Sequence, residues 1–329
     1  MKTFIRCRRS ILAVLAALFF AAPLMAGEPL GTFIQFSRAS ADKSVEQWRA
    51  DLEQMSKAGI RRIIVQWVAE DPVAYFKSDL FPYAEPYAVL ERMFEAMKGM
   101  SFEVYLGLVH DPGYWTAISG RDITVRDYFL LRTARNLKVQ AALLDTFGSQ
   151  DSWKGYYIPD EIDDKSWRGD GRGGLVREYL RAMTAGLRKA DPRRKVAVSA
   201  FFRARTAPDV HARTLRGLVA DTGVDQVLVQ DGCGESDPPF RYLGDYYAAL
   251  QEGWKGAAPQ LECVVEAFRR VPTTNGVFAA EPVPASDLRS QIQLANRHFS
   301  GVLLFSFLDY TDPDLGTRGA EAYKVLLKP

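Results

Sequence analysis

Histidine and cysteine are scarce in this chain of 329 residues, which contains three of each. The histidines are far apart and show no metal-ligand spacing, so we expect no catalytic metal and no cofactor. Cys233 and Cys263 would lie on neighbouring strands, but their offset along the strands exceeds the reach of a disulfide. We therefore predict two free thiols packed in the fold. The three histidines are His110, His211 and His298.

The sequence also lacks an apolar run long enough to span a membrane. Its longest run, Ile11 to Leu24, has about 14 residues against the ~20 that a membrane helix needs. A basic start precedes this run, and Ala26-Gly27 follows it, as in a secretory signal peptide. We expect cleavage after residue 26 and a periplasmic or secreted domain over residues 27–329. The alternative, a membrane anchor, is disfavoured by the short run.

Neither sign of charge dominates, because 42 Lys and Arg stand against 40 Asp and Glu. The predicted signal peptide holds four of the bases and no acid, so the mature chain has 38 bases, 40 acids and a net charge of −2. No basic stripe with interleaved aromatic residues is present. Nucleic acid is therefore not an expected partner. We expect a monomer that contacts no membrane after cleavage.

Eight short apolar runs alternate with helical patterns along the chain. Their nearly continuous apolar character is typical of parallel strands that are covered on both faces. An open doubly wound sheet would alternate in the same way, but the usual glycine-rich turn after its first strand is missing. We predict an α/β fold, a single (β/α)₈ TIM barrel. The predicted strands are Thr32–Ser37, Arg62–Val68, Phe102–Val109, Lys154–Pro159, Lys195–Phe201, Gln226–Gln230, Leu261–Glu266 and Gly301–Phe307.

Two glutamates stand at the ends of the fourth and seventh runs, Glu161 and Glu266. All strands of such a barrel point the same way, so these carboxyl groups should converge on one open mouth. Side chains alternate along a strand, which places Glu161 on the face opposite to Asp160. Two converging carboxyl groups are the minimum equipment for cleaving a glycosidic bond.

The two glutamates have different predicted roles. Glu161 steps off an apolar strand into a cleft, where partial desolvation raises the pKa and suits a proton donor. Glu266 would attack the anomeric carbon as an ionised nucleophile. The alternative for each is a structural ion pair, with Arg203 for Glu161 and with Arg269 or Arg270 for Glu266. Competing acids at the same mouth are Asp231, Glu235 and Asp309.

Side chains that bind the sugar should surround the pair. Sugar rings present C–H faces to aromatic residues and hydroxyl groups to amides and carboxylates. Trp67, Trp115 and Trp167 are candidate stacking platforms, with loop packing as the alternative. The predicted substrate-binding residues, at strand ends or in the loops that follow them, are Gln35, Gln66, Trp67, His110, Asp111, Asp160, Asp163, Trp167, Arg203, Gln230, Asp231 and Tyr310.

The sequence resembles a known family. Its most specific segment is Tyr157-Ile158-Pro159-Asp160-Glu161-Ile162-Asp163-Asp164, with weaker support from Gly31-Thr32-Phe33-Ile34-Gln35 and Ile64-Val65-Gln66-Trp67. Together these look like a bacterial barrel family, catalogued as a domain of unknown function in the glycoside-hydrolase superfamily. By similarity to the retaining barrel glycosidases, the acid/base maps to Glu161 and the nucleophile to Glu266. Asp160 stands where that clan usually has Asn.

The leading hypothesis is a secreted or periplasmic glycoside hydrolase that acts on a polysaccharide or oligosaccharide. A second is a non-catalytic carbohydrate-binding barrel associated with exopolysaccharide, since the Asn of the clan is replaced and fold alone does not give function. A third, an aldolase, would need a lysine at the mouth. Lys154 and Lys195 begin their strands at the opposite end, which disfavours an aldolase.

Overall fold

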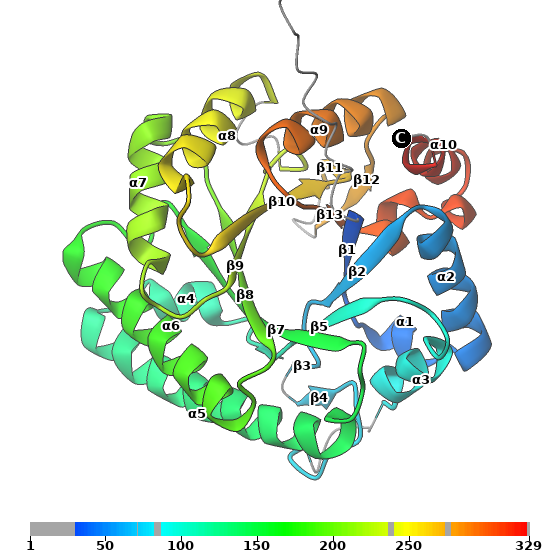
Figure 1. Ribbon diagram of the computed structural model, residues 1–329, viewed down its shortest axis with the longest axis horizontal. Coiled ribbons are helices and arrows are strands. Elements are labelled where there is room, and N and C mark those ends of the chain that lie inside the picture. Colours follow the sequence, from blue (N-terminus) through cyan, green and yellow to red (C-terminus); the bar gives the residue numbers. More distant parts are fainter. Residues whose placement is uncertain (1–29, 71, 82–86, 236–239, 274–277, 328–329) are drawn as a thin grey trace, which may run out of the picture.

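The computed structural model describes residues 30–70, 72–81, 87–235, 240–273 and 278–327. The predicted signal peptide, residues 1–26, lies outside the described residues. Eight parallel strands form a closed barrel, in the order β1-β13-β10-β9-β8-β7-β5-β2, and helices surround it (Figure 1). The predicted TIM barrel is thereby confirmed, and a closed sheet rules out the open doubly wound alternative. Glu161 and Glu266 belong to its fourth and seventh strands, β7 and β10.

The barrel strands lie close to the predicted runs. The largest difference is β7, which continues past the predicted end at Pro159 because residues Ile162 and Asp163 also pair with β8. The barrel strands are β1 (Leu30–Ile34), β2 (Ile60–Val65), β5 (Glu103–Gly107), β7 (Trp153–Asp163), β8 (Lys195–Phe201), β9 (Gln226–Gln230), β10 (Gln260–Glu266) and β13 (Val302–Phe305).

Most helices pack their apolar face on the outside of the barrel. In α2, Ser44 caps the first turn by accepting a hydrogen bond from the backbone N–H of Gln47, and Trp48, Leu52 and Met55 are buried. The helix α6 begins at Asp170, in a glycine-rich turn of low intrinsic helix propensity. The helices are α1 (Arg38–Ala41), α2 (Val45–Lys57), α3 (Val89–Ala96), α4 (Tyr114–Ile118), α5 (Asp122–Phe147), α6 (Asp170–Ala190), α7 (Pro208–Val219), α8 (Phe240–Trp254), α9 (Ala285–His298), α10 (Thr317–Leu326), the π-helix η1 (Phe307–Thr311) and the 3₁₀-helix η2 (Pro313–Leu315).

Smaller sheets decorate the loops that follow the barrel strands. One joins β3 (Ala69–Glu70), β4 (Val73–Ala74) and β6 (Val109–His110), and the other joins β11 (Phe268–Arg270) to β12 (Ala280–Pro282). Among the helices of the described ranges, none combines the length and the apolar character that crossing a membrane requires.

The barrel interior is a packed apolar layer, to which every barrel strand contributes one buried side chain. Gly155 leaves room for the ring of Tyr105, which a Cβ atom at that position would overlap. This layer closes the barrel beneath the mouth, so a ligand at the mouth rests on a solid floor. The eight residues of the layer are Phe33, Ile64, Tyr105, Tyr157, Ala197, Leu228, Val264 and Leu303.

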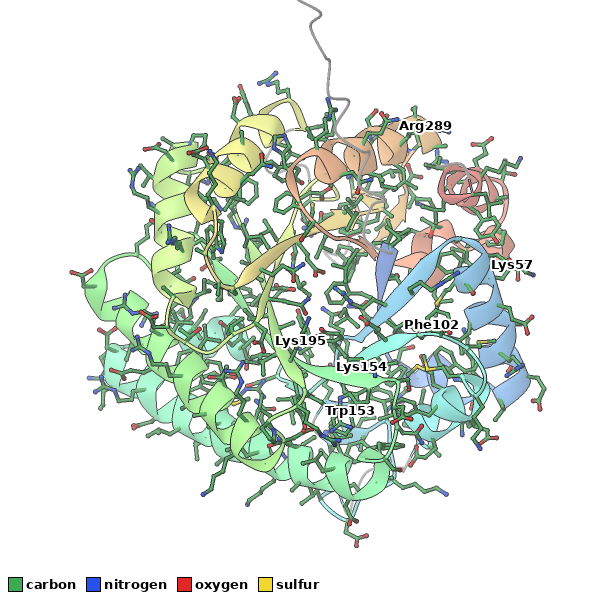
Figure 2. The ribbon with its side chains drawn as sticks, viewed as in Figure 1. Lys57, Phe102, Trp153, Lys154, Lys195 and Arg289 are labelled. Carbon is green, nitrogen blue, oxygen red and sulfur yellow. The ribbon has the colours of Figure 1, made fainter. Side chains whose placement is uncertain are left out.

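A buried ion pair fills the opposite end of the barrel. The Nη1 atom of Arg62 lies 2.7 Å from Glu262 Oε2, and Gln226 Nε2 donates to Glu262 Oε1 at 2.8 Å. Lys154 and Lys195 also begin β7 and β8 at this end, away from the mouth (Figure 2). The strand-end lysine that an aldolase would need is therefore not supplied by either residue.

Candidate active site

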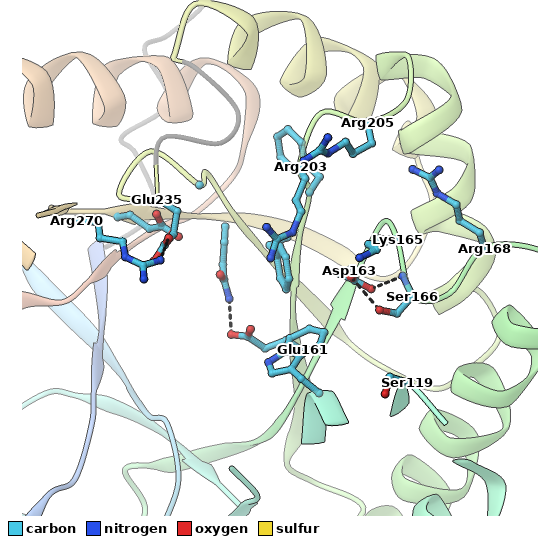
Figure 3. Close-up of a pocket in the computed structure, with 16 residues that line it drawn as sticks. Ser119, Glu161, Asp163, Lys165, Ser166, Arg168, Arg203, Arg205, Glu235 and Arg270 are labelled. Atoms are coloured by element: carbon cyan, nitrogen blue, oxygen red, sulfur yellow. Dashed lines mark hydrogen bonds and ion pairs between the residues drawn. The ribbon is translucent and has the colours of Figure 1, made fainter. Parts of the chain in front are cut away.

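A cavity of ≈ 1140 Å³ opens at the C-terminal ends of the barrel strands, and both glutamates line it (Figure 3). Active sites of TIM barrels lie at this end, in the loops that follow the strands. The residues that line the cavity are Trp115, Ser119, Glu161, Asp163, Lys165, Ser166, Arg168, Phe201, Phe202, Arg203, Arg205, Gln230, Gly232, Glu235, Glu266 and Arg270.

Glu161 lines the cavity and lies in an irregular part of β7. Between Ile158 and Ile162, β7 advances four residues while β8 advances two, which is a bulge that redirects the strand. Gln230 Nε2, at the end of β9, donates a hydrogen bond to Glu161 Oε1 at 2.6 Å. Burial raises the pKa of Glu161, and the Gln230 hydrogen bond opposes that rise. The group is therefore held in place and favours its protonated form more than an exposed glutamate does.

Glu266 is the last residue of β10, and its carboxyl group is almost fully buried. The backbone N–H of Gly234 donates to Glu266 Oε2 at 2.7 Å. A Cβ atom on Gly234 would lie only 2.8 Å from that oxygen and 2.5 Å from the ring of Phe268, so the contact requires glycine. Burial, followed by the negative charge of Asp231, raises the pKa of Glu266 to about 8.

Asp231 lies behind Glu266 and does not line the cavity. Its Oδ1 atom accepts hydrogen bonds from the backbone N–H groups of Cys233 and Glu266, and Gln291 Nε2 donates to Oδ2 at 2.9 Å. Asp231 is fully buried, and this burial raises its pKa. The sequence proposed Asp231 as a contact for the substrate, whereas its hydrogen bonds join the loop after β9 to the end of β10.

Asp160 faces away from Glu161, as the alternation along the strand predicts, and it is also absent from the cavity lining. Arg132 Nη2 of α5 lies 2.8 Å from Asp160 Oδ1, and the Tyr179 hydroxyl of α6 donates to Oδ2. Arg132 and Asp160 are both buried. Asp160 therefore joins β7 to the two helices outside it.

Three of the twelve predicted binding residues line the cavity: Asp163, Arg203 and Gln230. Ser166 donates to Asp163 from both its N–H and its hydroxyl, at 2.8 and 3.1 Å, which fixes the start of the loop after β7. The nine others that were predicted do not line it; they are Gln35, Gln66, Trp67, His110, Asp111, Asp160, Trp167, Asp231 and Tyr310.

Several of these nine are engaged in packing. Trp67 stacks on His110 with ring centroids 4.4 Å apart, and the Tyr128 hydroxyl donates to Asp111. Trp167 is only 1% exposed and stacks on Phe129. Of the three candidate tryptophan platforms, Trp115 alone lines the cavity; it is 42% exposed and packs edge-on against Phe201 at 5.5 Å. The ring of Tyr310 lies 5.2 Å from that of Phe268.

The sequence interpretation missed three basic residues of the cavity lining. Lys165 and Arg168 lie in the loop after β7, and Arg205 lies in the loop after β8, beside the predicted Arg203. The signal was their position, since loops that follow barrel strands surround the mouth. Ser119, Ser166, Phe201, Phe202 and Gly232 were also not predicted.

The sequence also led to predictions about metal sites and thiols. Within the described ranges, no group of three or more His, Cys, Asp and Glu side chains is arranged to hold a metal ion. Cys233 and Cys263 are free thiols, as predicted. The Tyr247 hydroxyl lies 3.2 Å from the buried Cys263 sulfur, so this thiol is part of the packing behind β10.

Comparison with solved structures shows glycosidase-like barrels. A candidate α-L-fucosidase of Bacteroides thetaiotaomicron is 17% identical, with a TM-score of 0.71 over 92% of this chain and 96% of that chain. An intracellular xylanase of Thermoanaerobacterium saccharolyticum is 10% identical, with a TM-score of 0.50 over 85% of this chain and 86% of that chain. At such identities the likeness concerns the fold.

Comparison of the sequence identifies the family. The chain is 25% identical over 260 residues to the uncharacterized protein YbcH of Escherichia coli strain K12, which covers 79% of this chain and 83% of that relative. Residues 30–316 match the family described as "Domain of unknown function (DUF4434)". This chain, a (β/α)₈ barrel, therefore belongs to the DUF4434 family.

Proposed function

We propose that this protein is a glycoside hydrolase that cleaves a polysaccharide or oligosaccharide with Glu161 and Glu266. One observation carries the proposal: both carboxyl groups, from the fourth and seventh barrel strands, line the same cavity. Paired carboxyl groups on opposite sides of the scissile bond are the working parts of most glycosidases. The cavity, at ≈ 1140 Å³, exceeds the ~300–1,000 Å³ of sites for small ligands and has room for several sugar units.

In the proposed first step, Glu161 gives its proton to the glycosidic oxygen as the bond to the anomeric carbon breaks. Its raised pKa supports this role, since the acid must carry a proton at working pH. The Gln230 amide fixes Oε1, so Oε2 is the oxygen that remains for the leaving group. Glu266 attacks the anomeric carbon with Oε1 while the Gly234 N–H holds Oε2, and a glycosyl-enzyme forms.

In the proposed second step, Glu161 has become a carboxylate and takes a proton from water. That water attacks the anomeric carbon, releases Glu266 and gives a sugar of retained configuration. Glu266 must lose its own proton before the first step, because only the carboxylate is a nucleophile. The pKa of Glu266 is raised to about 8, so higher pH favours the nucleophile, whereas Glu161 must keep its proton; kcat/KM of the free enzyme should therefore pass through a maximum with pH.

The edge-on pair of Trp115 and Phe201 lines the cavity and offers an apolar face for a sugar ring.

We further propose that the protein is exported to the periplasm or medium, because residues 1–26 combine a basic start with a short apolar run. We also propose that the enzyme is a monomer and needs no cofactor. N-terminal sequencing of the purified protein should begin near Gly27; an intact Met1 in the cytoplasmic fraction would contradict export.

The experiment that tests the proposal is a screen of the protein against bacterial exopolysaccharides and aryl glycosides, followed by two variants on the substrate that is found. Glu161→Gln should lower hydrolysis of natural glycosides by roughly 10²–10⁴-fold and nearly spare the first step on substrates with good leaving groups. Glu266→Ala should abolish hydrolysis, and azide should restore turnover with inverted product, because azide occupies the vacated face of the sugar. In Glu161→Ala the azide product should keep the original configuration.

The control is Glu252→Gln, an exposed glutamate of α8, whose activity should match the wild type. If neither active-site change lowers activity on a confirmed substrate, the two glutamates are not catalytic. Saccharide binding without any turnover would instead favour the non-catalytic barrel. One observation favours the non-catalytic barrel as the second candidate function. Asp160, at the position where retaining glycosidases usually have Asn, is bonded to Arg132 and Tyr179 and does not face the cavity.

A further inference from the structure

Four cationic side chains gather on one side of the cavity: Lys165, Arg168, Arg203 and Arg205, here named the basic wall. Two come from the loop after β7 and two from the loop after β8. Figure 3 shows them on the side of the cavity away from the Glu235–Arg270 pair, with Glu161 between the two sides. The whole chain has a formal net charge of only +2, so this concentration of positive charge is local.

Two cations of the basic wall, Lys165 and Arg203, form no ion pair with a residue in the described part of the chain. The Arg203 guanidinium lies over the ring of Phe201, at 5.6 Å from its centroid. Arg168 Nε donates to the backbone carbonyl of Asp164 at 2.8 Å, which leaves its terminal nitrogens for other partners. By contrast, Arg270 across the cavity is paired with Glu235 at 2.8 Å.

The acids that line the cavity offset this charge only in part. Asp163 accepts two hydrogen bonds from Ser166, and Glu235 is neutralised by Arg270. Burial raises the pKa of Glu161, and burial together with the charge of Asp231 raises the pKa of Glu266 to about 8, so Glu266 carries little negative charge at neutral pH. A cleft that is lined by one sign of charge and bounded by protein attracts ligands of the opposite sign.

The basic wall also borders a second cavity. Arg203 and Arg205 line this neighbouring space of ≈ 500 Å³ together with Tyr242, Asp245 and Tyr246. The two arginines therefore lie between the catalytic cavity and a continuation toward α8. A chain of several sugars that occupied both cavities would pass directly over these guanidinium groups.

We propose that the substrate is an anionic saccharide, whose carboxylate or sulfate groups bind the basic wall while the scissile bond lies at Glu161 and Glu266. This inference rests on the proposed hydrolase function and names its substrate class. A guanidinium group offers parallel N–H donors that match a carboxylate or a sulfate, and such charge-assisted bonds are about twice as strong as neutral ones. Arg203 and Lys165 are the specificity-determining residues, since neither is held by an acid of the described chain.

The test measures binding to the Glu161→Gln variant, in which the basic wall is intact, by titration calorimetry. The carboxylate probes are polygalacturonate, alginate and hyaluronan, each compared with its carboxyl-reduced neutral form. The sulfate probe is dextran sulfate, compared with dextran. We expect at least one acidic probe to bind on the order of 10-fold or more tightly than its neutral counterpart, and added NaCl to weaken that binding.

Two further variants then locate the effect. Arg203→Gln and Lys165→Gln, made in the Glu161→Gln background, should each weaken binding of the acidic probe on the order of 10-fold and leave its neutral form unaffected. Matched controls are Arg289→Gln on α9 and Lys57→Gln on α2, exposed cations outside the barrel that should bind like the parent (Figure 2).

The outcomes separate this inference from the proposed function. Failure of every acidic probe to bind better than its neutral form overturns the anionic substrate. So does an equal loss in the Arg289→Gln control, which would mean that net charge alone attracts the probe. If a neutral substrate is found whose hydrolysis requires Glu161 but is unchanged in Arg203→Gln, the hydrolase function is supported and the anionic substrate is contradicted. If an acidic probe binds selectively but no turnover depends on Glu161, the anionic ligand is supported and the hydrolase function is contradicted.

Discussion

The backbone N–H of Glu266 donates a hydrogen bond to Asp231 Oδ1 at 3.2 Å, which places a second buried acid behind the proposed nucleophile. The two residues come from neighbouring strands, since Asp231 directly follows β9 and Glu266 ends β10. Their closeness makes the ionisation of one depend on the other. The pair is best regarded as a single titrating unit with macroscopic pKa values. This relationship leads to the first two predictions.

The first prediction concerns the Glu161→Gln variant with an aryl glycoside that has a good leaving group. Because this substrate needs no proton donor, its kcat/KM should follow the ionised fraction of Glu266. The pKa of Glu266 is raised to about 8, so kcat/KM should rise with pH below that value and level off above it. A pH–rate profile measures this directly. A profile that falls as pH rises would assign the proton-donor role to Glu266.

The second prediction is that Asp231→Asn moves this rise in activity to lower pH. Removing the negative charge of Asp231 favours the ionised form of Glu266 and therefore lowers its pKa. The asparagine oxygen can still accept from the N–H groups of Glu266 and Cys233. The measurement is the same profile in the Glu161→Gln background. An unchanged midpoint would show that burial alone sets the pKa of Glu266.

The third prediction tests the close approach of the loop to the nucleophile. Gly234→Ala should lower kcat on the order of 10²-fold, since the new methyl group would push against Glu266 Oε2 and Phe268 and shift the carboxylate. Gly217→Ala, on the exposed face of α7 with no atom within 4 Å of the added carbon, is the control and should retain full activity. Equal activity of the two variants would remove the Gly234 contact from the mechanism.

The fourth prediction concerns Asp160→Asn, which introduces the residue expected at this position from the resemblance to retaining glycosidases. It should destabilise the protein by about 3–5 kcal/mol without raising activity, because buried Arg132 would lose its only acidic partner among the described ion pairs. Urea unfolding and kinetics on one preparation measure both effects. Asp209→Asn breaks an exposed pair with Arg213 and should leave the free energy of unfolding close to that of the wild type. Higher activity in Asp160→Asn would show that residue 160 acts on the substrate.

The fifth prediction compares two acids that share Arg62 at the closed end of the barrel. Glu262 is fully buried and lies 2.7 Å from the arginine, whereas Glu103 is half-exposed at 3.3 Å. Glu262→Gln should lower the free energy of unfolding by about 3–5 kcal/mol, since the largely buried Arg62 would keep only the half-exposed Glu103 as an acidic partner. Glu103→Gln should change it by about 0–1 kcal/mol. Similar losses in urea unfolding would mean that water reaches the closed end of the barrel.

The sequence alone was sufficient for the barrel and for the placement of its two glutamates. The eight apolar runs and the helical patterns between them can be recognised from residues that are close in sequence. Because all strands of the barrel run in the same direction, the C-terminal ends of the fourth and seventh strands must lie at the same mouth. The opposite orientation of Asp160 and Glu161 also followed from the alternation of side chains along a strand.

Only the tertiary structure decided which side chains reach the cavity. The bulge around Glu161 depends on the pairing of β7 with β8, and Asp160 is held by Arg132 and Tyr179 from two helices. Trp67 packs on His110, although its position at a strand end indicated sugar binding. Likewise, the pKa of Glu266 is raised by burial within the fold and, after that, by the charge of Asp231, 35 residues earlier in the chain. Contacts between residues distant in sequence leave no local pattern, so strand order could be inferred from the sequence but the partner of each side chain could not.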